Sequence, residues 1–283
     1  SEDDIPRKPL EIVNLQLRWT HQFQFAGYYV ALEKGFYREA GLDVRLHEGG
    51  PDREAVDEVL AGKAAYGTAN SEALQARLQG KPLVALAAIF QHSPLVLLAR
   101  ADADIRTPHD LVGRKVMLTR GKRDTEFIAM FLREGIRPDS IDIIFSSPSR
   151  IDDLVAGRVD AVTAYLTNEP FMLRQRGMEY VAINPSNYGI DYYGEILFTT
   201  EAEIEAHPDR VRAMREASLK GWRYAMDHTD EIIDLLIDTY HVPKSREHLE
   251  FEAHVARSLI LPDLVEIGHM NPGRWRGVAE VLK

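Results

Sequence analysis

The sequence predicts an α/β protein with two similar units, each organised around a mixed, mostly parallel sheet. Three observations lead to this prediction: strand-like and helix-like segments alternate over residues 12–183, a weak repeat relates residue 60 to residue 155, and helical patterns dominate residues 209–258. Alternating strands and helices joined by short links favour parallel sheets that are covered by helices.

The first unit begins with an apolar run that leads into a helix. The first helix stops at Gly35, with a second stop signal at Gly41, because glycine readily takes the backbone conformation that ends a helix. Strands are expected at residues 12–17, 43–47, 65–68, 84–90 and 95–100, and helices at 26–34, 53–61 and 72–79.

The same alternation restarts after Asp104. Thr107 and Pro108 open a short helix, with threonine as the N-cap and proline at the first helical position, where its missing N–H costs nothing. Strands are then expected at residues 115–119, 141–145, 161–165 and 180–183, and helices at 125–133, 151–155 and 169–176.

The two units echo each other. Segment 60–65 (LAGKAA) corresponds to segment 155–160 (VAGRVD), and each is a helix end at glycine that leads into a strand. In both units the next helix also ends at glycine, at Gly80 or Gly177. Helix–glycine–strand is common in α/β proteins, but agreement over two successive elements favours paired lobes over one continuous sheet.

The order of strand and helices in the last third of the chain predicts a discontinuous domain. A strand at 196–199 precedes helices at 209–226, 229–240 and 249–258. If that strand returns to the first lobe, lobe one comprises residues 1–102 and 195–283, and lobe two comprises 103–194. The two crossings, near 100–104 and 192–195, then form a hinge, and a cleft between hinged lobes is a common place for ligands.

Composition narrows the class of function. The formal net charge is -10 and no basic run is present, which disfavours nucleic acid or an anionic membrane as the main partner. Cysteine is absent, which removes thiol catalysis, disulfides and zinc–cysteine sites and fits an oxidising compartment. The histidines are scattered and no His-Glu-x-x-His occurs, so no metal site is expected.

A polar–aromatic turn joins the first strand to the first helix. It contains Trp19, His21, Gln22 and Phe25 within the stretch 18–43. A helix N-terminus offers free N–H donors and partial positive charge, and the rings offer flat faces for stacking. The pattern predicts a small-ligand site here, and a plain strand–helix corner with core aromatics is the alternative.

Several motifs carry a resemblance to a known family. The run over 19–44, with AGYYVA, KGFY and GLDV, resembles the opening of the thiamine-pyrimidine-synthase/sulfonate-binding-protein-like family. GTANS at 67–71, LVALAAIFQHSP at 83–94, YLTNEP at 165–170 and YGIDYYGEILFT at 188–199 agree with it. The resemblance covers nearly the whole chain and implies a two-lobe type II periplasmic-binding-protein fold.

The resemblance implies a cleft lined by loops of both lobes. Its expected ligand-binding residues are Trp19, His21, Gln22, Phe25, Asn70, Gln91, His92, Tyr165, Asn168, Glu169, Tyr188 and Tyr192. The rings would stack on a planar ligand, and Glu169 would accept hydrogen bonds from ring amino groups. A related family member binds an aminopyrimidine in this way, so a thiamine-precursor pyrimidine is the first expectation.

Each of these residues has a structural alternative. Glu169, just ahead of Pro170, is placed to offset a helix dipole. His21 can serve a backbone contact in its loop, His92 can belong to a turn, and the tyrosines near 190 can belong to the core.

Two functions follow from the resemblance. HQFQFAGYY, AIFQHSP, AYLTNEPF and GHMNPGRW most resemble the extracytoplasmic sensor modules of bacterial histidine kinases and related signalling proteins. Such a sensor would clamp a small planar molecule and signal through a helix beginning near Gly273. Segments outside this chain would tether it to the membrane, and a homodimer is possible. The alternative is the free periplasmic substrate-binding protein of an ABC importer for a pyrimidine, sulfonate or related solute, which docks on a permease.

The C-terminal segment is expected to continue beyond this chain. Trp275, Val278, Ala279 and Leu282 follow helical spacing, and no glycine or proline stop signal follows before Lys283.

Neither catalysis nor a cofactor is expected. The eukaryotic pyrimidine synthases of the family use a histidine in the opening loop and a cysteine-rich motif, as the resemblance implies. The position of that histidine is Phe25 here, and the chain has no cysteine. A solute-binding clamp needs only shape and hydrogen bonds.

Overall fold

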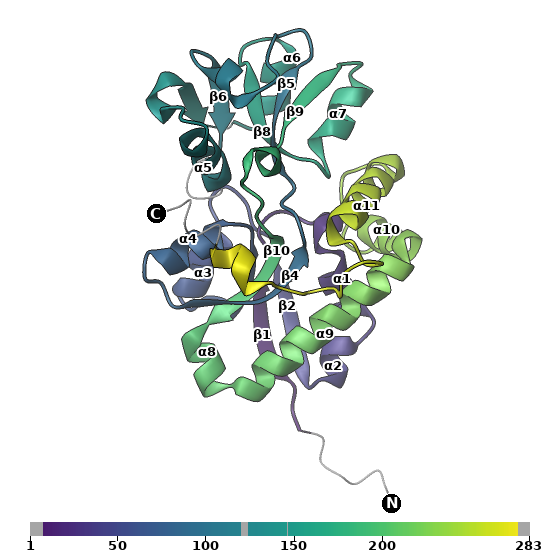
Figure 1. Ribbon diagram of the computed structural model, residues 1–283. Helices are drawn as coiled ribbons and strands as arrows, with labels where there is room; N and C mark the ends of the chain where they lie inside the picture. Colours follow the sequence, from purple (N-terminus) through teal and green to yellow (C-terminus); the bar gives the residue numbers. More distant parts are fainter. Residues whose placement is uncertain (1–7, 120–123, 146, 277–283) are drawn as a thin grey trace, which may run out of the picture.

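Two five-stranded sheets organise the residues that the computed structural model describes, 8–119, 124–145 and 147–276 (Figure 1). From edge to edge, the first sheet contains β2 (Leu42–His47), β1 (Glu11–Gln16), β3 (Tyr66–Ala69), β10 (Gly194–Thr200) and β4 (Leu83–Phe90). The second contains β7 (Asp142–Phe145), β6 (Lys115–Leu118), β8 (Ala161–Tyr165), β5 (Leu95–Arg100) and β9 (Tyr180–Ile183).

Helices flank both sheets, and each sheet with its helices is called a lobe below (Figure 1). The first lobe contains α1 (Ala26–Glu33), α2 (Phe36–Glu39), α3 (Ala55–Leu60), α4 (Glu72–Leu78), α8 (Glu201–Ala206), α9 (Pro208–Asp227), α10 (Thr229–Asp238) and α11 (Arg246–Ile260). The second contains α5 (Thr125–Arg133), α6 (Arg150–Val155) and α7 (Glu169–Gln175).

Each sheet is mixed, which agrees with the mixed, mostly parallel sheets that the sequence predicted, and its pairs are divided between parallel and antiparallel. Strand β1 pairs in parallel with β2 and β3, and β6 pairs in parallel with β7 and β8. Strand β10 is antiparallel to β3 and β4, and β5 is antiparallel to β8 and β9. The antiparallel strands are those that arrive directly from the other lobe. Each enters its sheet from the hinge side and therefore runs against its neighbours.

The first crossing between lobes lies earlier than the expected 100–104. Strand β5 belongs to the second sheet, so the chain leaves the first sheet at residues 91–94, directly after β4. The apolar runs 84–90 and 95–100, separated by four residues, resemble a hairpin within one sheet. The second passage, between β9 and β10, covers residues 184–193.

The core of the first lobe depends on a close approach of α1 and α9. Trp222 is fully buried and its ring meets Tyr28 edge-on, with centroids 5.6 Å apart. Gly27 and Gly221 let the helix backbones approach, because a Cβ on Gly221 would lie 2.1 Å from the Gly27 carbonyl oxygen. A Cβ on Gly27 would lie 2.1 Å from Cγ of Trp222.

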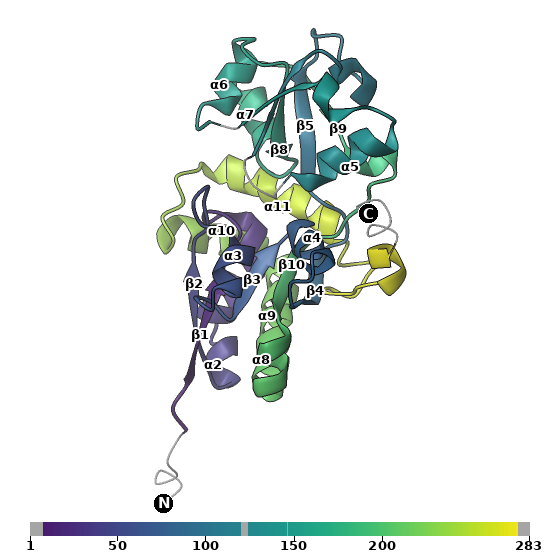
Figure 2. The same ribbon diagram turned by 90° about the vertical axis from the view of Figure 1, so that its left-hand side faces the viewer.

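The C-terminal third returns to the first lobe and reaches the seam between lobes. Figure 2 shows α11 lying across the molecule beneath the second lobe. Residues 272–276 are helical, but Val278, Ala279 and Leu282 of the expected terminal helix lie outside the described residues. Among the described helices, none combines the length and apolar character that a membrane crossing requires.

We predict that Gly221→Ala lowers the free energy of unfolding by about 1–3 kcal/mol, because the added methyl group forces α1 away from α9. Urea unfolding followed by circular dichroism measures the change. Gly50→Ala is the matched control, since a Cβ there meets nothing within 4 Å and the expected change stays within about 0.5 kcal/mol. Equal midpoints for the two variants would contradict the close packing.

Candidate functional site

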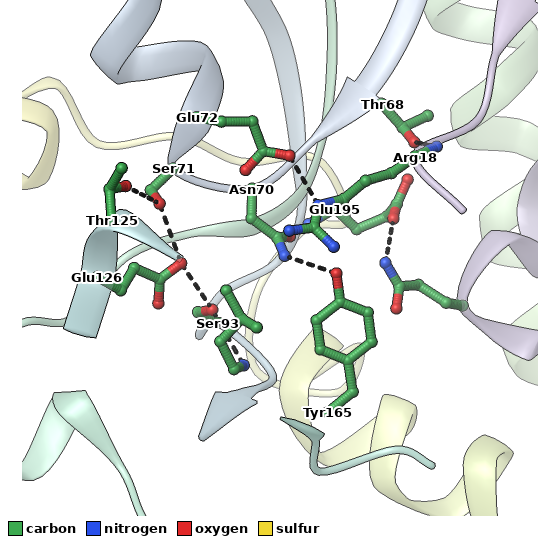
Figure 3. A network of polar contacts seen from close by, with 12 residues as sticks. Arg18, Thr68, Asn70, Ser71, Glu72, Ser93, Thr125, Glu126, Tyr165 and Glu195 are labelled. Carbon is green, nitrogen blue, oxygen red and sulfur yellow. Dashed lines mark hydrogen bonds and ion pairs between the residues drawn. The ribbon is translucent and has the colours of Figure 1, made fainter. Parts of the chain in front are cut away.

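Charged side chains from both lobes converge where the lobes meet (Figure 3). Arg18 follows β1, Glu72 begins α4 after β3, and Glu195 lies in β10. From the second lobe, Glu126 lies in the first turn of α5. All four side chains are buried, and we call them the seam cluster. The carboxyl ends of parallel strands meet at one edge of a sheet, which is why segments so distant in sequence lie together.

Arg18 is the structural centre of the first-lobe half. Its Nε donates to Oε1 of Glu72 at 2.7 Å, and its backbone N–H donates to the Thr68 hydroxyl at 3.0 Å. The guanidinium also lies over the ring of Tyr165 from the second lobe, 5.1 Å from the ring centre. Arg18 therefore contacts both lobes (Figure 3).

Direct hydrogen bonds join the lobes at the same place. Asn70 accepts from the backbone N–H of Glu195 at 3.0 Å through Oδ1, and its Nδ2 donates to the Tyr165 hydroxyl at 3.4 Å. The Ser71 hydroxyl donates to Oε1 of Glu126 at 3.1 Å. Asn70 and Ser71 lie in the first lobe and their partners Tyr165 and Glu126 in the second, so the structure shows the lobes in contact.

Each carboxyl group of the seam cluster has one oxygen that is unpaired among the described residues. Oε2 of Glu72, Oε2 of Glu126 and Oε1 of Glu195 are buried without a hydrogen-bond partner in the described part of the chain. Leaving a buried polar atom unpaired costs about 1–3 kcal/mol, and more for a charged group. Three such oxygens at one seam are suited to a ligand that brings N–H donors.

The environment of the cluster keeps two carboxyls protonated. Burial, together with the charge of Glu72, raises the pKa of Glu126 to about 8, against the lowering effect of hydrogen bonds from Ser93 and Ser71. Burial likewise raises the pKa of Glu195 to about 8, against a hydrogen bond from Gln24. Without a ligand at neutral pH, the cluster therefore holds the Arg18–Glu72 ion pair and two largely neutral carboxyls.

The backbone at Glu195 is also unusual. Its φ is +47°, in the left-handed region that a residue with a Cβ rarely adopts, and the side chain is fully buried. Such conformations cost about 1–3 kcal/mol and are often found at functional sites. Oε2 of Glu195 accepts from Gln24 Nε2 at 2.9 Å, which orients the carboxyl.

A cavity of about 410 Å³ lies between the lobes, and its lining does not include the seam cluster. Its lining comes from both lobes: Pro148, Arg150, Ile151, Asp152, Asn168, Met172, Gln175, Arg176, Pro243, Lys244 and His248. Tyr165 connects the cavity with the cluster, because its backbone N–H donates to Glu169 at 3.0 Å while its hydroxyl reaches Asn70.

Asn168 and Glu169 contact protein groups at this cavity. Asn168 Oδ1 lies 2.6 Å from Nε2 of His248, whose ring stacks on Phe171 at 4.6 Å. Burial lowers the pKa of His248 to about 4. The two Glu169 oxygens are held by Arg150 and by the backbone N–H of Tyr165. The expected role of Glu169 as a ligand acceptor stays a prediction, and in this structure both of its oxygens have protein partners.

Among the other predicted site residues, Asn70, Tyr165 and Tyr192 lie at the seam. The Tyr192 hydroxyl has no hydrogen-bond partner within the described residues, and burial and the charge of Glu126 raise its pKa. Gln22 is buried in the turn before α1, and its Nε2 likewise has no hydrogen-bond partner in the described residues.

The remaining candidates have structural surroundings. Phe25 is fully buried in the core of the first lobe, as the plain-corner alternative expected, and Trp19 packs half-buried against the same core. His21 lies against Tyr29 and Tyr240 and close to Glu48. Tyr188 packs against the core of the second lobe.

Gln91 and His92 lie in the hinge. The Gln91 amide donates to the carbonyl oxygens of Ala88 and His269, which ties the first crossing to the C-terminal segment. His92 Nδ1 lies 2.7 Å from Oδ1 of Asp191, so the side chain bridges the two crossings. Neither contact points to a ligand.

The sequence analysis did not nominate any member of the seam cluster. Arg18 directly follows an apolar strand, and Glu195 directly precedes the apolar run Ile196–Phe198. A charged residue next to a buried strand end was the signal available for these two. For Glu126 the available signal was a carboxylate beside Phe127 at the start of an amphipathic helix, a common pattern on exposed helices.

No group of three or more His, Cys, Asp or Glu side chains suited to a metal ion occurs in the described ranges. The seam can supply hydrogen bonds, a guanidinium and aromatic faces, which is the chemistry of a binding site.

Known proteins share this sequence pattern. The model of a family described as NMT1/THI5 like matches residues 22–232. A formylaminopyrimidine-binding protein of Halalkalibacterium halodurans is 28% identical over 236 residues, which cover 81% of this chain and 70% of that protein. Riboflavin-binding protein RibY of Chloroflexus aurantiacus is 26% identical over 232 residues, 80% of this chain and 66% of that protein.

Not every relative is named as a binding protein. A protein of Legionella pneumophila subsp. pneumophila named 4-amino-5-hydroxymethyl-2-methylpyrimidine phosphate synthase is 21% identical over 230 residues, 79% of this chain and 72% of that protein.

The fold has solved counterparts. The alkanesulfonate-binding protein SsuA of Xanthomonas axonopodis pv. citri, bound to MOPS, matches with a TM-score of 0.73 and 14% identity, covering 98% of this chain and 93% of that one. At this identity the likeness concerns the fold alone. It confirms the two-lobe periplasmic-binding-protein fold that the motifs implied.

We predict that Glu195→Gln flattens the loss of stability between pH 5 and pH 8. The pKa of Glu195 is raised from 4.5 to about 8 in the folded chain. The folded state therefore binds more protons in this range, and stability falls as the pH rises. As the pH rises, the free energy of unfolding of the variant should increase relative to that of wild type by at most about 1.4 kcal/mol per pH unit. Thermal unfolding across this range measures the gain.

Glu203→Gln is the matched control for the loss of a buried carboxyl. Glu203 is ion-paired with Arg210 at 2.5 Å, so its replacement should lower the melting temperature at pH 8. If Glu195→Gln lowers stability at pH 8 to the same extent, Glu195 is an ordinary paired carboxylate and our account of the cluster is wrong.

Proposed function

The chain belongs to the NMT1/THI5-like family, and on that premise we propose that it is the substrate-binding protein of an ABC importer. It closes its two lobes on a small planar heterocycle that carries amino groups. We place this function outside the cytoplasm, where such proteins deliver solutes to a permease. Closure follows from a higher ligand affinity of the closed state, which shifts the population of the lobes toward contact.

The observation that carries this proposal is a set of buried carboxyl oxygens in the seam cluster. Glu72, Glu126 and Glu195 each present a buried oxygen that has no hydrogen-bond partner among the described residues. Ring amino groups and ring N–H groups donate to carboxyl oxygens, and these hydrogen bonds become charge-assisted when the carboxyl is ionised. An anionic sulfonate needs donors instead, and its burial beside Glu72, or beside Glu126 and Glu195 once these are ionised, would be unfavourable.

Aromatic side chains at the seam agree with a planar ligand. Tyr165 already presents one ring face to the Arg18 guanidinium, and Tyr192 places an unpaired hydroxyl close to Glu126. Rings of this kind stack on heterocycles. An aminopyrimidine is the simplest molecule that combines a flat face with N–H donors, and one relative is named for binding a formylaminopyrimidine.

The importer hypothesis replaces the sensor hypothesis. The relatives and structural counterparts described above are named as binding proteins or, in one case, as a synthase, and none of these four is named as a kinase sensor. The similarity to the named synthase does not bring its chemistry here, because Phe25 occupies the position of the expected histidine and the chain has no cysteine.

A ligand panel tests the proposal. Thermal unfolding is measured with 4-amino-5-hydroxymethyl-2-methylpyrimidine, riboflavin, an aromatic acid and an alkanesulfonate. A ligand at a hundredfold excess over its Kd adds about 2.7 kcal/mol to the stability of the folded protein. We expect stabilisation by the aminopyrimidine and none by the alkanesulfonate. Stabilisation by the alkanesulfonate alone would contradict the proposal.

We predict that Tyr165→Phe weakens binding of that aminopyrimidine by about 2- to 10-fold, because the closed state loses its hydrogen bond to Asn70. Isothermal titration calorimetry measures the affinity. Tyr224→Phe is the matched control, since its hydroxyl donates to Glu231 at 2.6 Å in the first lobe, between α9 and α10. Equal affinities for the two variants would remove the Tyr165–Asn70 contact from the closing mechanism.

A further inference from the structure

We propose that Glu126 selects the charge of the ligand: the lobes close on a heterocycle that is bound as a cation, and this cation replaces a proton that the Glu126 carboxyl holds in the empty protein. The inference rests on the proposed function and specifies the substrate class as basic or permanently cationic nitrogen heterocycles.

The position of Glu126 in the fold gives it this role. It is 1% exposed and is the member of the seam cluster that the second lobe contributes. Its Oε1 accepts from Ser71 of the first lobe at 3.1 Å and from Ser93 of the hinge at 3.2 Å. Its Oε2 is buried and has no hydrogen-bond partner in the described part of the chain. Lobe closure therefore carries this carboxyl into a cluster that already contains carboxyls.

Among the described residues, the charges that face Glu126 leave its negative charge without a partner of its own. From the first lobe these are Arg18 after β1 and Glu72 at α4, and Arg18 already pairs with Glu72 at 2.7 Å. From its own lobe, Asp124 precedes it by two residues at the N-cap of α5, and Tyr192 before β10 lies close enough for the charge of Glu126 to raise the pKa of its hydroxyl. Of these groups, all within the described residues, only Arg18 is cationic.

The protonation of Glu126 follows from this balance. Burial and the charge of Glu72 raise its pKa to about 8, against hydrogen bonds from Ser93 and Ser71 and the charge of Arg18. At pH 7 the carboxyl keeps its proton, and the lobes meet without burying an unpaired anion. In that state Oε1 accepts from Ser71 and Ser93, and the O–H on Oε2 has no acceptor in the described part of the chain; Oε2 becomes an acceptor for a ligand N–H once the proton has left.

Ligand binding then exchanges the proton in one of two balanced ways. A permanently cationic ring enters, the Glu126 O–H bond breaks, and the proton leaves to solvent. A neutral basic ring enters and takes the same proton on its ring nitrogen, so that none is released. Both routes end with a cationic ring that donates a hydrogen bond to the Glu126 carboxylate, through a ring N⁺–H or through an exocyclic C–NH₂ group.

Isothermal titration calorimetry at pH 7, in two buffers of different ionisation enthalpy, counts the protons. The probes are 4-amino-5-hydroxymethyl-2-methylpyrimidine, its ring-N-methylated cation, and uracil as a planar ring without a basic nitrogen. For wild type we expect release of close to one proton with the methylated cation. We also expect uracil to bind at least 10-fold more weakly than the aminopyrimidine.

Glu126→Gln keeps the acceptor oxygen but cannot ionise. This substitution should abolish proton release and weaken binding of the methylated cation by about 10- to 100-fold. It should also reduce the ratio of the affinity for the aminopyrimidine to the affinity for uracil. Glu203→Gln changes a buried carboxyl that is paired with Arg210 in the first lobe. It should leave the number of protons released, the affinity for the methylated cation and the preference for the aminopyrimidine over uracil unchanged. Binding of the cation without proton release, or equal affinities in wild type and Glu126→Gln, overturns the inference.

A measurement without ligand separates this inference from the proposed function. Carbon-13 NMR of glutamate-labelled protein, with the Glu126 signal assigned by its loss in Glu126→Gln, follows the carboxyl directly. A titration midpoint of the Glu126 carboxyl near pH 8 supports its proton-holding role even if no probe binds. In that case only the proposed ligand class is wrong. A midpoint below pH 5 overturns the role of Glu126 whatever the ligand.

Discussion

Contact between the two lobes depends on how the negative charge of the buried carboxyls is neutralised. The seam cluster brings three glutamates and one arginine into a region without solvent, and Arg18 is already committed to Glu72. Burying an uncompensated ion costs several kcal/mol, so Glu126 and Glu195 must be protonated or must meet a cation. Protonation permits contact in the empty protein, and in our proposal a ligand with N–H donors makes the same contact favourable.

The fold delivers these groups to one place through its two antiparallel strands. Strands β5 and β10 start at the hinge and enter their sheets against their neighbours, so the hinge segments lie beside the carboxyl ends of β1, β3 and β8. Glu195 stands at the start of one such strand with a positive φ, held by Gln24 and by Asn70. The hinge and the site are therefore built from the same few residues.

Much of the fold was predictable from the sequence, because hydrophobic periodicity and glycine stops are local signals. The first crossing was misplaced because two apolar runs separated by Gln91–Pro94 look the same in a hairpin and in a chain that changes sheets. Of the predicted site residues, Asn70 and Tyr165 lie in the seam network, whereas Phe25 lies in the core. Glu126 and Glu195 escaped prediction because their importance comes from distant partners, which spacing along the chain does not reveal.

The identity of the natural ligand tests the account most directly. Native mass spectrometry of the protein, purified from its own cells without denaturation, detects a bound small molecule by its mass and fragments. The account predicts a basic or cationic nitrogen heterocycle with exocyclic amino or ring N–H groups. A co-purified sulfonate, carboxylate or other anion, lost when Arg18 is replaced but kept when Glu126 is replaced, would contradict it.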